Sequence, residues 1–524
     1  MRLPPAAVLW GLLAGPWAGL PDPAWAQSAA HRHADAPGID WFAGEVSAAF
    51  DAAKRSGKPL LLYWGASWCP PCQQLKSTVF SRPDFIARSR LFVPVYLDGD
   101  DEGAQKWGEQ FRVLGYPTVV VLDAERHELM RIAGGMDLEQ YTTVLDTALA
   151  HLDPADALLA ASAGGRALDL NQCRRLAFNS WELGPDADAA ASARLAQQLD
   201  AAAALCPADA HLERARLRVF AAAYGAHAEA DALKAQRPPS AALRNRLAAV
   251  GQVLAQERTA VKVSDALQSL DEDAFRAVKT AGFSASRWLR NYDAAMDAAA
   301  ADPGFAEADR LGAIGSKLTA LKTIKGAIPS GAARAARARV TVVLAEDQAP
   351  YVRSGIINAV LPIFDLLGLN EQAYAVVQAE LRRTATPYYY KADLGELAEH
   401  LGRKDEALRW YAEAYAEAVG PATRFQWGRM YATSLLRLSP EDVARISVVT
   451  TQVLGELAGP DRIYRRDRIN LVRLDQALRK WNSDAGSAHR DVLVALRERL
   501  QQICVKIPAA EPARGSCDAF LSGV

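Results

Sequence analysis

Leu60-Leu61-Leu62-Tyr63-Trp64-Gly65-Ala66-Ser67-Trp68-Cys69-Pro70-Pro71-Cys72 is the stretch that decides the fold of the first part of this chain. It consists of a short apolar run, a turn and two cysteines that are separated by two residues. The length of the apolar run and the Lys58-Pro59 before it predict a buried strand. A helix is expected to follow the cysteines to about Phe80, so the pair lies where a strand gives way to a helix.

Strands and helices alternate around this stretch, between residues 39 and 152. The predicted helices are 45–55, 101–113 and one that Asp137 caps, and the other predicted strands are 91–97, 118–122 and 129–132. Pro94 has no N–H group for a ladder, which favours an edge strand or a bulge. The acidic loop 98–102 lacks the spacing of an EF-hand and is interpreted as a solvated turn. The alternation predicts an α/β domain.

Residues 153–524 have a different character. They are rich in Ala and Leu and almost free of strand patterns, and Gly, Pro or Asp turns separate the predicted helices. The run Val340–Leu344 follows a helical pattern without a break and is predicted to be helical. This part of the chain is therefore expected to be a large all-α domain.

One part of the helical region repeats itself. Gly368 and Gly402 are 34 residues apart, and so are Ala373 and Ala407, which is the period of tetratricopeptide helix–turn–helix units. Residues 350–460 resemble that family, and the second copy carries most of the pattern, with Leu394, Gly395, Tyr411 and Ala414. The closing Pro stands two positions late, at 421. A plain α-helical bundle is the alternative.

The N-terminus has the pattern of a signal peptide. Arg2 precedes the apolar stretch Ala6–Leu20, and Ala24-Trp25-Ala26 is a small-x-small cleavage site. We expect a signal peptide at residues 1–26, cleavage after Ala26 and a flexible leader at 27–38. A retained membrane anchor is the alternative. The pattern favours export to a bacterial periplasm, where disulfides persist.

Bulk composition excludes several kinds of partner for the 524-residue chain. A formal net charge of −1 gives neither a basic surface for nucleic acid nor an acidic tail for a charged partner. After the N-terminal stretch no run of 18 consecutive apolar residues follows, so no integral membrane segment is expected after cleavage.

The cysteine pair predicts thiol–disulfide exchange. A thiol at the start of a helix meets unpaired N–H groups and the helix dipole, which stabilise its thiolate. Cys69 is therefore the expected nucleophile, and Cys72, one turn on, is the expected resolving thiol. A static bridge or half of a zinc site is the alternative, but zinc needs four ligands and no second Cys-x-x-Cys is present. We expect no metal and no cofactor.

Residues 39–152 resemble a thioredoxin-fold domain. Trp68 before the cysteine pair and Gly115-Tyr116-Pro117-Thr118 before a strand carry the resemblance. It implies that Pro117 is cis and faces the cysteines, and that Trp68, Tyr116 and Pro117 contact the substrate chain. The sequence patterns at 57–62 and 78–83 are similar to those in the C-terminal domain of the membrane electron transporter that reduces periplasmic proteins. The two prolines between the cysteines also resemble the motif of exported reductants of the cytochrome c maturation type.

One position departs from the thioredoxin pattern. Thioredoxins place a buried Asp six residues before the first Cys, where it moves the proton of the second Cys, and Tyr63 stands there in this chain. The Lys that normally lies near that Asp aligns with Pro94. Proton transfer for Cys72 must then use water, Tyr63 or a carboxylate from elsewhere, which leaves the exchange rate and the redox potential open.

Four further cysteines make two structural bridges the expected arrangement. Six cysteines allow 15 connectivities, and sequence proximity favours Cys173–Cys206 and Cys504–Cys517 beside the active pair. Cys173 lies early in a helix predicted at 168–183, and Cys206 ends the next one, so the bridge would staple a helical hairpin. An electron relay from the active site is the alternative.

Two functions from different classes follow. The first is an exported thiol–disulfide oxidoreductase whose helical repeats hold disulfide-containing partner proteins in a groove. The resemblance implies a reductant that an inner-membrane electron donor recharges, although the residues leave the direction open. The second is a periplasmic scaffold or chaperone whose thioredoxin fold serves as a docking module.

Overall fold

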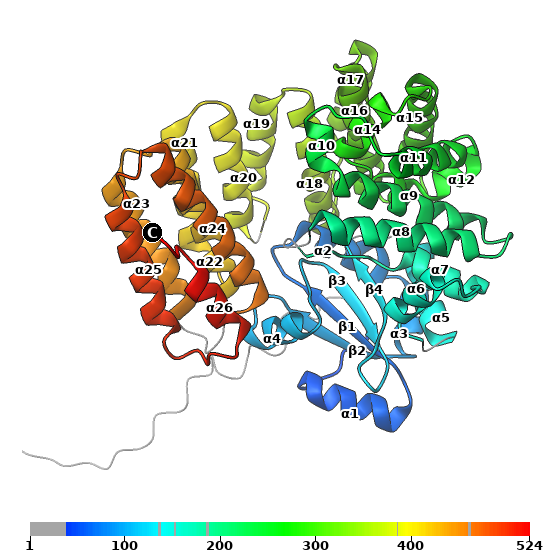
Figure 1. Cartoon of the computed structure of the whole chain (residues 1–524), viewed down its shortest axis with the longest axis horizontal. Coiled ribbons are helices and arrows are strands. Elements are labelled where there is room, and N and C mark those ends of the chain that lie inside the picture. Colours follow the sequence, from blue (N-terminus) through cyan, green and yellow to red (C-terminus); the bar gives the residue numbers. More distant parts are fainter. Residues whose placement is uncertain (1–37, 135–137, 151–152, 185–187, 385, 459–462) are drawn as a thin grey trace, which may run out of the picture. The chain divides into compact units, whose positions relative to one another are not determined.

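Four strands form one mixed sheet near the start of the chain (Figure 1). The computed structural model describes residues 38–134, 138–150, 153–184, 188–384, 386–458 and 463–524. The expected signal peptide, almost all of the expected leader and the Asp137 cap lie outside the described residues. The strand order is β2-β1-β3-β4, with bounds β1 Leu60–Gly65, β2 Val93–Asp98, β3 Thr118–Leu122 and β4 Glu128–Ala133. β1 pairs with β2 in parallel and with β3 antiparallel, and β3 and β4 form a hairpin.

The side chains of β1 alternate between two apolar layers. Leu61 and Tyr63 pack with α2, α3 and α5 on one face, and Leu60, Leu62 and Trp64 pack with α1 and α4 on the other. Both faces are covered, which explains why the strand is a continuous apolar run. The helices of this part are α1 Val46–Ser56, α2 Pro70–Leu75, α3 Pro83–Ser89, α4 Glu102–Gln110 and α5 Leu138–Ala150. A π-helical segment, η2 Lys76–Phe80, continues α2.

The two edges of the sheet are both protected. β2 is an edge strand, as Pro94 predicts, and the Pro94 carbonyl accepts a hydrogen bond of 2.8 Å from the N–H of Phe42. On the β4 edge, the Arg131 N–H donates to Asn179 Oδ1 at 2.8 Å and the Ser180 N–H donates to the Arg131 carbonyl at 2.9 Å. Both edges thus find partners for backbone groups that would otherwise invite another strand.

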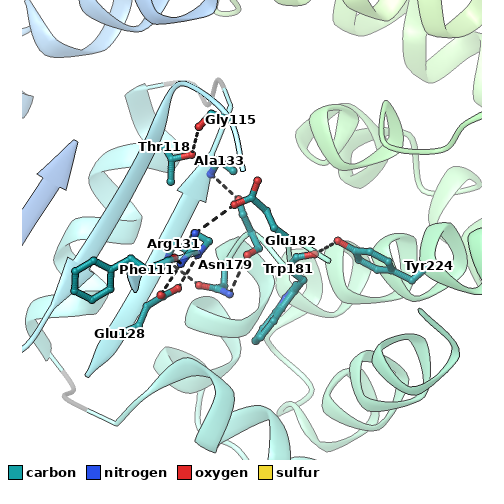
Figure 2. A network of polar contacts seen from close by, with 11 residues as sticks. Phe111, Gly115, Thr118, Glu128, Arg131, Ala133, Asn179, Trp181, Glu182 and Tyr224 are labelled. Carbon is teal, nitrogen blue, oxygen red and sulfur yellow. Dashed lines mark hydrogen bonds and ion pairs between the residues drawn. The ribbon is translucent and has the colours of Figure 1, made fainter. Parts of the chain in front are cut away.

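Arg131 anchors the β4 edge to the helical region (Figure 2). Its guanidinium pairs with Glu128 at 2.7 Å, reaches Glu182 at 3.4 Å and donates to the Phe111 carbonyl at 2.5 Å. Burial lowers the pKa of Arg131, but the two carboxylates outweigh it, so the net direction is upward. The positive charge of Arg131 is therefore held where the sheet meets residues 179–182.

Helices make up the rest of the described chain. Their bounds are α6 Ala155–Ala163, α7 Leu170–Phe178, α8 Ala189–Leu205, α9 His211–Ala228, α10 Ala230–Lys234, α11 Ala241–Leu254, α12 Glu257–Lys262, α13 Ser264–Leu267, α14 Glu272–Thr280, α15 Ala285–Ala301, α16 Glu307–Lys325, α17 Ser330–Ala345, α18 Pro350–Leu366, α19 Asn370–Glu380, α20 Pro387–His400, α21 Lys404–Glu417, α22 Pro421–Leu438, α23 Val443–Gly455, η3 Glu456–Ala458, α24 Arg465–Asp484, α25 Arg490–Cys504 and α26 Pro512–Ala519. The fold is thus a thioredoxin-like sheet and helices, followed by a long all-helical region. Contacts join the described residues into one unit, and the division at 152/153 stays a prediction.

Several predicted elements differ from the structure at their ends. Val340–Leu344 lies in α17 as predicted, but α7 ends at Phe178 instead of Leu183. The reason is the β4 edge, because Asn179 has an extended backbone, and the Asn179 side chain and the Ser180 N–H bond the backbone of Arg131. The predicted strand 91–97 begins at Val93, after a turn in which the Phe92 N–H bonds the Ser89 carbonyl.

The repeat candidate consists of paired helices with glycine at the turns. Gly368 and Gly402 have φ of +66° and +73°, which non-glycine residues rarely adopt, and each follows a helix. Gly395 lies against the Tyr411 ring, where a Cβ would be 2.8 Å from a ring carbon. Tyr411 therefore fills space against its own partner helix. The assignment of these helices to the tetratricopeptide family stays a prediction.

Candidate active site

The Cys69–Cys72 pair forms a disulfide at the start of α2. Cys69 is the N-cap residue, and its sulfur accepts a hydrogen bond of 3.2 Å from the Cys72 N–H. Pro70 and Pro71 occupy the first helical positions, where a missing N–H costs nothing. Cys69 is 2% exposed and Cys72 is fully buried. The order strand, cysteine pair, helix is that of the prediction.

A short turn carries the chain from β1 to Cys69. The Cys69 N–H bonds the Ala66 carbonyl at 3.3 Å, and the Gln73 side-chain amide donates to the Ser67 carbonyl at 2.7 Å. The turn is therefore tied at both ends to the helix that it introduces. These bonds fix the position of Trp68 and of the sulfur that follows it.

The loop before β3 lies against the cysteine pair. The Tyr116–Pro117 peptide bond is cis, and Tyr116 packs against the buried cluster that contains both cysteines. The Tyr116 hydroxyl donates to the Gly99 carbonyl at 2.9 Å and accepts from the Gln105 amide at 2.7 Å. A Cβ at Gly99 would overlap the Tyr116 ring, so only glycine fits there.

Trp68 is the centre of an aromatic cluster that the helical region supplies. Its ring centroid lies 6.1 Å from that of Tyr389 on α20, with the planes nearly parallel, and 5.6 Å from that of Trp427 on α22. The guanidinium of Arg466 on α24 lies 5.1 Å from the Trp68 ring and 5.1 Å from the Tyr116 ring. Such contacts attract a cation to an aromatic face. Three helices thus meet at the residue before Cys69, and sequence reasoning missed all three side chains.

Asp100 joins the sheet domain to the helical region. Its carboxylate accepts a hydrogen bond of 2.7 Å from the Trp68 indole and another from the Thr423 hydroxyl on α22. Burial raises its pKa, and the bonds from Thr423, the charge of Arg466 and the Trp68 bond oppose that rise. The acidic loop was expected to be a solvated turn, and the structure instead makes Asp100 a half-buried acceptor.

Tyr63 stands where thioredoxins have a buried acid. Its hydroxyl keeps its own proton and is therefore a poor proton acceptor. The side chain is fully buried, with ring centroids 4.8 Å from Phe80 and 5.5 Å from Tyr96, and its hydroxyl has no hydrogen-bond partner among the described residues. Burial, and to a smaller degree Asp98, raises its pKa. Tyr63 is therefore a neutral group in the aromatic core of the domain.

A groove opens beside Cys69, with a volume of about 650 Å³. Ser67, Trp68, Pro70 and Gln73 line one wall. The other wall belongs to the helical region, and its lining residues are Glu346, Asp347, Gln348, Pro350, Tyr351, Arg353, Ser354, Glu380, Arg383, Thr384, Thr386, Tyr389 and Tyr390. We call this space the active-site groove.

The other four cysteines lie away from the groove and form two disulfides. Cys173 and Cys206 are joined between α7 and the end of α8, and Cys504 and Cys517 between α25 and α26. All four side chains are buried. No helix of the described chain is long and apolar enough to cross a membrane.

The sheet, the cysteine pair at a helix start and the cis Pro117 define a thioredoxin-like domain. Residues 46–149 match the thioredoxin-like domain family. The thiol:disulfide interchange protein DsbD of Cronobacter sakazakii (strain ATCC BAA-894) is 30% identical over 101 residues, which are 18% of this chain and 18% of that protein. This similarity supports thiol–disulfide exchange as the type of chemistry.

Two solved structures also resemble this part of the chain. A thioredoxin from Thermus thermophilus is 25% identical, with 21% of this chain and 88% of that chain covered and a TM-score of 0.20. A DsbH oxidoreductase is 23% identical, with 21% and 85% covered and a TM-score of 0.19. Each comparison concerns about a fifth of the chain.

Proposed function

We propose that this protein is an exported thiol–disulfide oxidoreductase that reduces or exchanges disulfides of periplasmic proteins through Cys69 and Cys72. The observation that carries the proposal is the position of Cys69, which caps a helix, accepts a hydrogen bond from the Cys72 N–H and packs with Tyr116, the residue before the cis Pro117. The Cys72 N–H and the dipole of this helix stabilise a negative sulfur, which makes Cys69 the attacking thiol.

The reaction takes two exchange steps. In the reduced protein the Cys69 thiolate attacks one sulfur of a partner disulfide, a mixed disulfide forms and the other partner sulfur leaves as a thiolate. Cys72 then loses its proton to water and attacks Cys69, which closes the Cys69–Cys72 bond and releases the second partner thiolate. The partner gains two electrons and the protein loses two. A dithiol donor at the inner membrane would return them.

Trp68, Tyr116 and Pro117 are the proposed contacts for the partner chain. The similarity to a thiol:disulfide interchange protein supports a disulfide-containing partner, and the helical region would hold it. Tetratricopeptide-like repeats at 350–460 would supply that surface. The structural role of the Cys173–Cys206 and Cys504–Cys517 disulfides belongs to the same proposal, since both lie outside the groove.

A Cys69→Ser variant of the full chain tests the proposed chemistry. We expect reduction of a disulfide-linked peptide, with dithiothreitol as electron source, to fall to the rate without protein. Activity equal to that of the unmodified protein would refute the enzymatic role. A redox potential near about −270 mV would place the pair with the reductants, and one near about −120 mV with the oxidants.

A scaffold or chaperone is the second candidate, because the helical region packs on Trp68 and so uses the thioredoxin-like domain as a docking surface. The two proposals separate in a Cys69→Ser/Cys72→Ser variant. Suppression of aggregation of an unfolded client by this variant, at the level of the unmodified protein, would favour the scaffold. Export itself is tested by the N-terminal residue of the protein isolated from the periplasm, which we expect to be Gln27.

A further inference from the structure

The active-site groove has an acidic lip that nothing in the proposed exchange chemistry requires. Glu346 and Asp347 lie between α17 and α18, on the wall opposite Pro70. Both side chains are exposed, and neither forms an ion pair within the described part of the chain. Glu346 accepts one hydrogen bond of 3.4 Å from the side-chain amide of Gln348. Both carboxylates thus line the groove without a cationic partner among the described residues.

The basic residues of the groove do not cancel this charge. Arg353 donates two hydrogen bonds, of 3.1 and 2.8 Å, to Glu380, and a third to the Leu344 carbonyl. Arg383 lies 3.8 Å from the same Glu380 carboxylate. Three carboxylates thus stand against two guanidinium groups, and the negative charge that remains sits on the lip formed by Glu346 and Asp347.

The walls of the groove suit an extended chain. Tyr351, which is 45% exposed, and the stacked rings of Tyr389 and Trp68 offer aromatic surface in the groove. A volume of about 650 Å³ is within the range of sites that bury a drug-sized ligand, so the groove has room for a few side chains of a bound segment. The mixture of aromatic walls and a charged lip is typical of surfaces that bind peptide segments.

The helical wall of the groove is held in place against α2, the helix that Cys69 caps. α18 packs on α2, and Gly355 permits this approach because a Cβ there would lie 3.3 Å from the Gln74 Cβ. The Gln74 amide donates to Asp309 on α16 at 3.0 Å. The wall that carries the acidic lip is therefore fixed relative to the helix that Cys69 caps.

We propose that the active-site groove binds an extended segment of a disulfide-containing protein that carries a basic side chain beside its cysteine. Glu346 and Asp347 would select that segment by charge, while Trp68, Tyr351 and Tyr389 contact it without regard to sequence. Small anionic disulfides such as glutathione disulfide would be disfavoured at the same lip. This inference rests on the proposed oxidoreductase function and names the substrate class for it.

The test compares the reduction of two disulfide-linked peptides by the full chain. One peptide carries Lys on both sides of its cysteine and the other carries Glu at these positions. At low ionic strength we expect kcat/KM to be about fivefold higher for the Lys peptide, the size of one or two partly screened ion pairs. Addition of 0.5 M NaCl should reduce the ratio toward one, since salt screens exposed charges.

Two variants make the test specific to the lip. The Glu346→Gln/Asp347→Asn variant should lose the preference for the Lys peptide. The Asp209→Asn/Glu257→Gln variant removes the same charge at exposed positions outside the groove and should keep the preference. A ratio near one in the unmodified protein, or a ratio unchanged in Glu346→Gln/Asp347→Asn, would overturn the inference.

The outcomes also distinguish a failure of charge selection from a failure of the proposed oxidoreductase function. Reduction of neither peptide would refute the oxidoreductase proposal itself. Equal reduction of both peptides would leave that proposal intact and remove the charge selection. Faster reduction of glutathione disulfide than of the Lys peptide would likewise contradict selection of a basic protein segment.

Discussion

The Cys69–Cys72 disulfide of the thioredoxin-like domain and the Cys173–Cys206 disulfide of the helical region are almost equally buried, yet their surroundings differ. Cys69 starts a helix beside a cis peptide bond and a groove, with the Cys72 N–H directed at its sulfur. Cys173 instead lies in the body of α7, in an apolar cluster with the leucines of α8. Position relative to the helix start, and not burial, is what distinguishes a candidate redox pair from a candidate staple.

Removal of the resolving thiol should produce the largest effect. In Cys72→Ser the Cys69 thiolate still attacks a partner disulfide, but the mixed disulfide has no internal thiol to release it. We expect turnover to fall by about a thousandfold, with a covalent adduct to the peptide visible by mass spectrometry. The Cys69→Ser variant is the control and should form no adduct. An adduct in both variants would place the nucleophile elsewhere.

Removal of the Cys173–Cys206 bridge should change stability instead of turnover. The bridge closes a loop of 33 positions, so its loss should lower the free energy of unfolding by about 3–4 kcal/mol. Urea denaturation of Cys173→Ser/Cys206→Ser measures this, and Cys504→Ser/Cys517→Ser, with a loop of 13, should lose about 3 kcal/mol. Loss of peptide reduction in a folded Cys173→Ser/Cys206→Ser variant would instead support an electron relay.

Asp467, the residue after Arg466 on α24, should make the stability of the protein depend on pH. Burial raises the pKa of Asp467 to about 6, and one of its oxygens has no hydrogen-bond partner among the described residues. The folded state therefore holds a proton that the unfolded state has lost, and stability should decrease as pH rises from about 4 to about 6. Asp467→Asn should remove about 3 kcal/mol of this decrease.

Urea denaturation at several pH values between 4 and 8 checks this prediction. The exposed Asp491→Asn on α25 is the matched control and should keep the pH dependence of the unmodified protein. Identical pH profiles for Asp467→Asn and the unmodified protein would show that Asp467 does not hold the proton.

The smallest effect is expected at the hydrogen bond between the two regions. Thr423→Val removes one donor to Asp100 and leaves the Trp68 indole as its remaining hydrogen-bond donor from a side chain. We expect a loss of about 1 kcal/mol in the free energy of unfolding. In the control, Thr451→Val, the lost bond is exposed and lies within α23, so the change should be smaller. An equal loss in both would assign the effect to the helix and not to the contact.

Sequence patterns predicted most of the sheet domain because its signals are local. The apolar run before Cys69 and the Pro94 edge strand agree with the structure. In the helical region, the helical interpretation of Val340–Leu344 also agrees with it. The end of α7 could not be predicted, since the helical pattern continues past Phe178. The break there is set by the backbone of β4, about fifty residues earlier, whose free edge bonds Asn179 and Ser180.

The sequence by itself determined the cysteine pair of the thioredoxin-like domain and the order strand, cysteines, helix, because these depend on neighbours within a few residues. Only the tertiary structure decided what lies over that pair. Tyr389, Trp427 and Arg466 reach Trp68 from three helices more than three hundred residues away. Contacts at that separation arise from the packing of whole helices, and no local spacing records them.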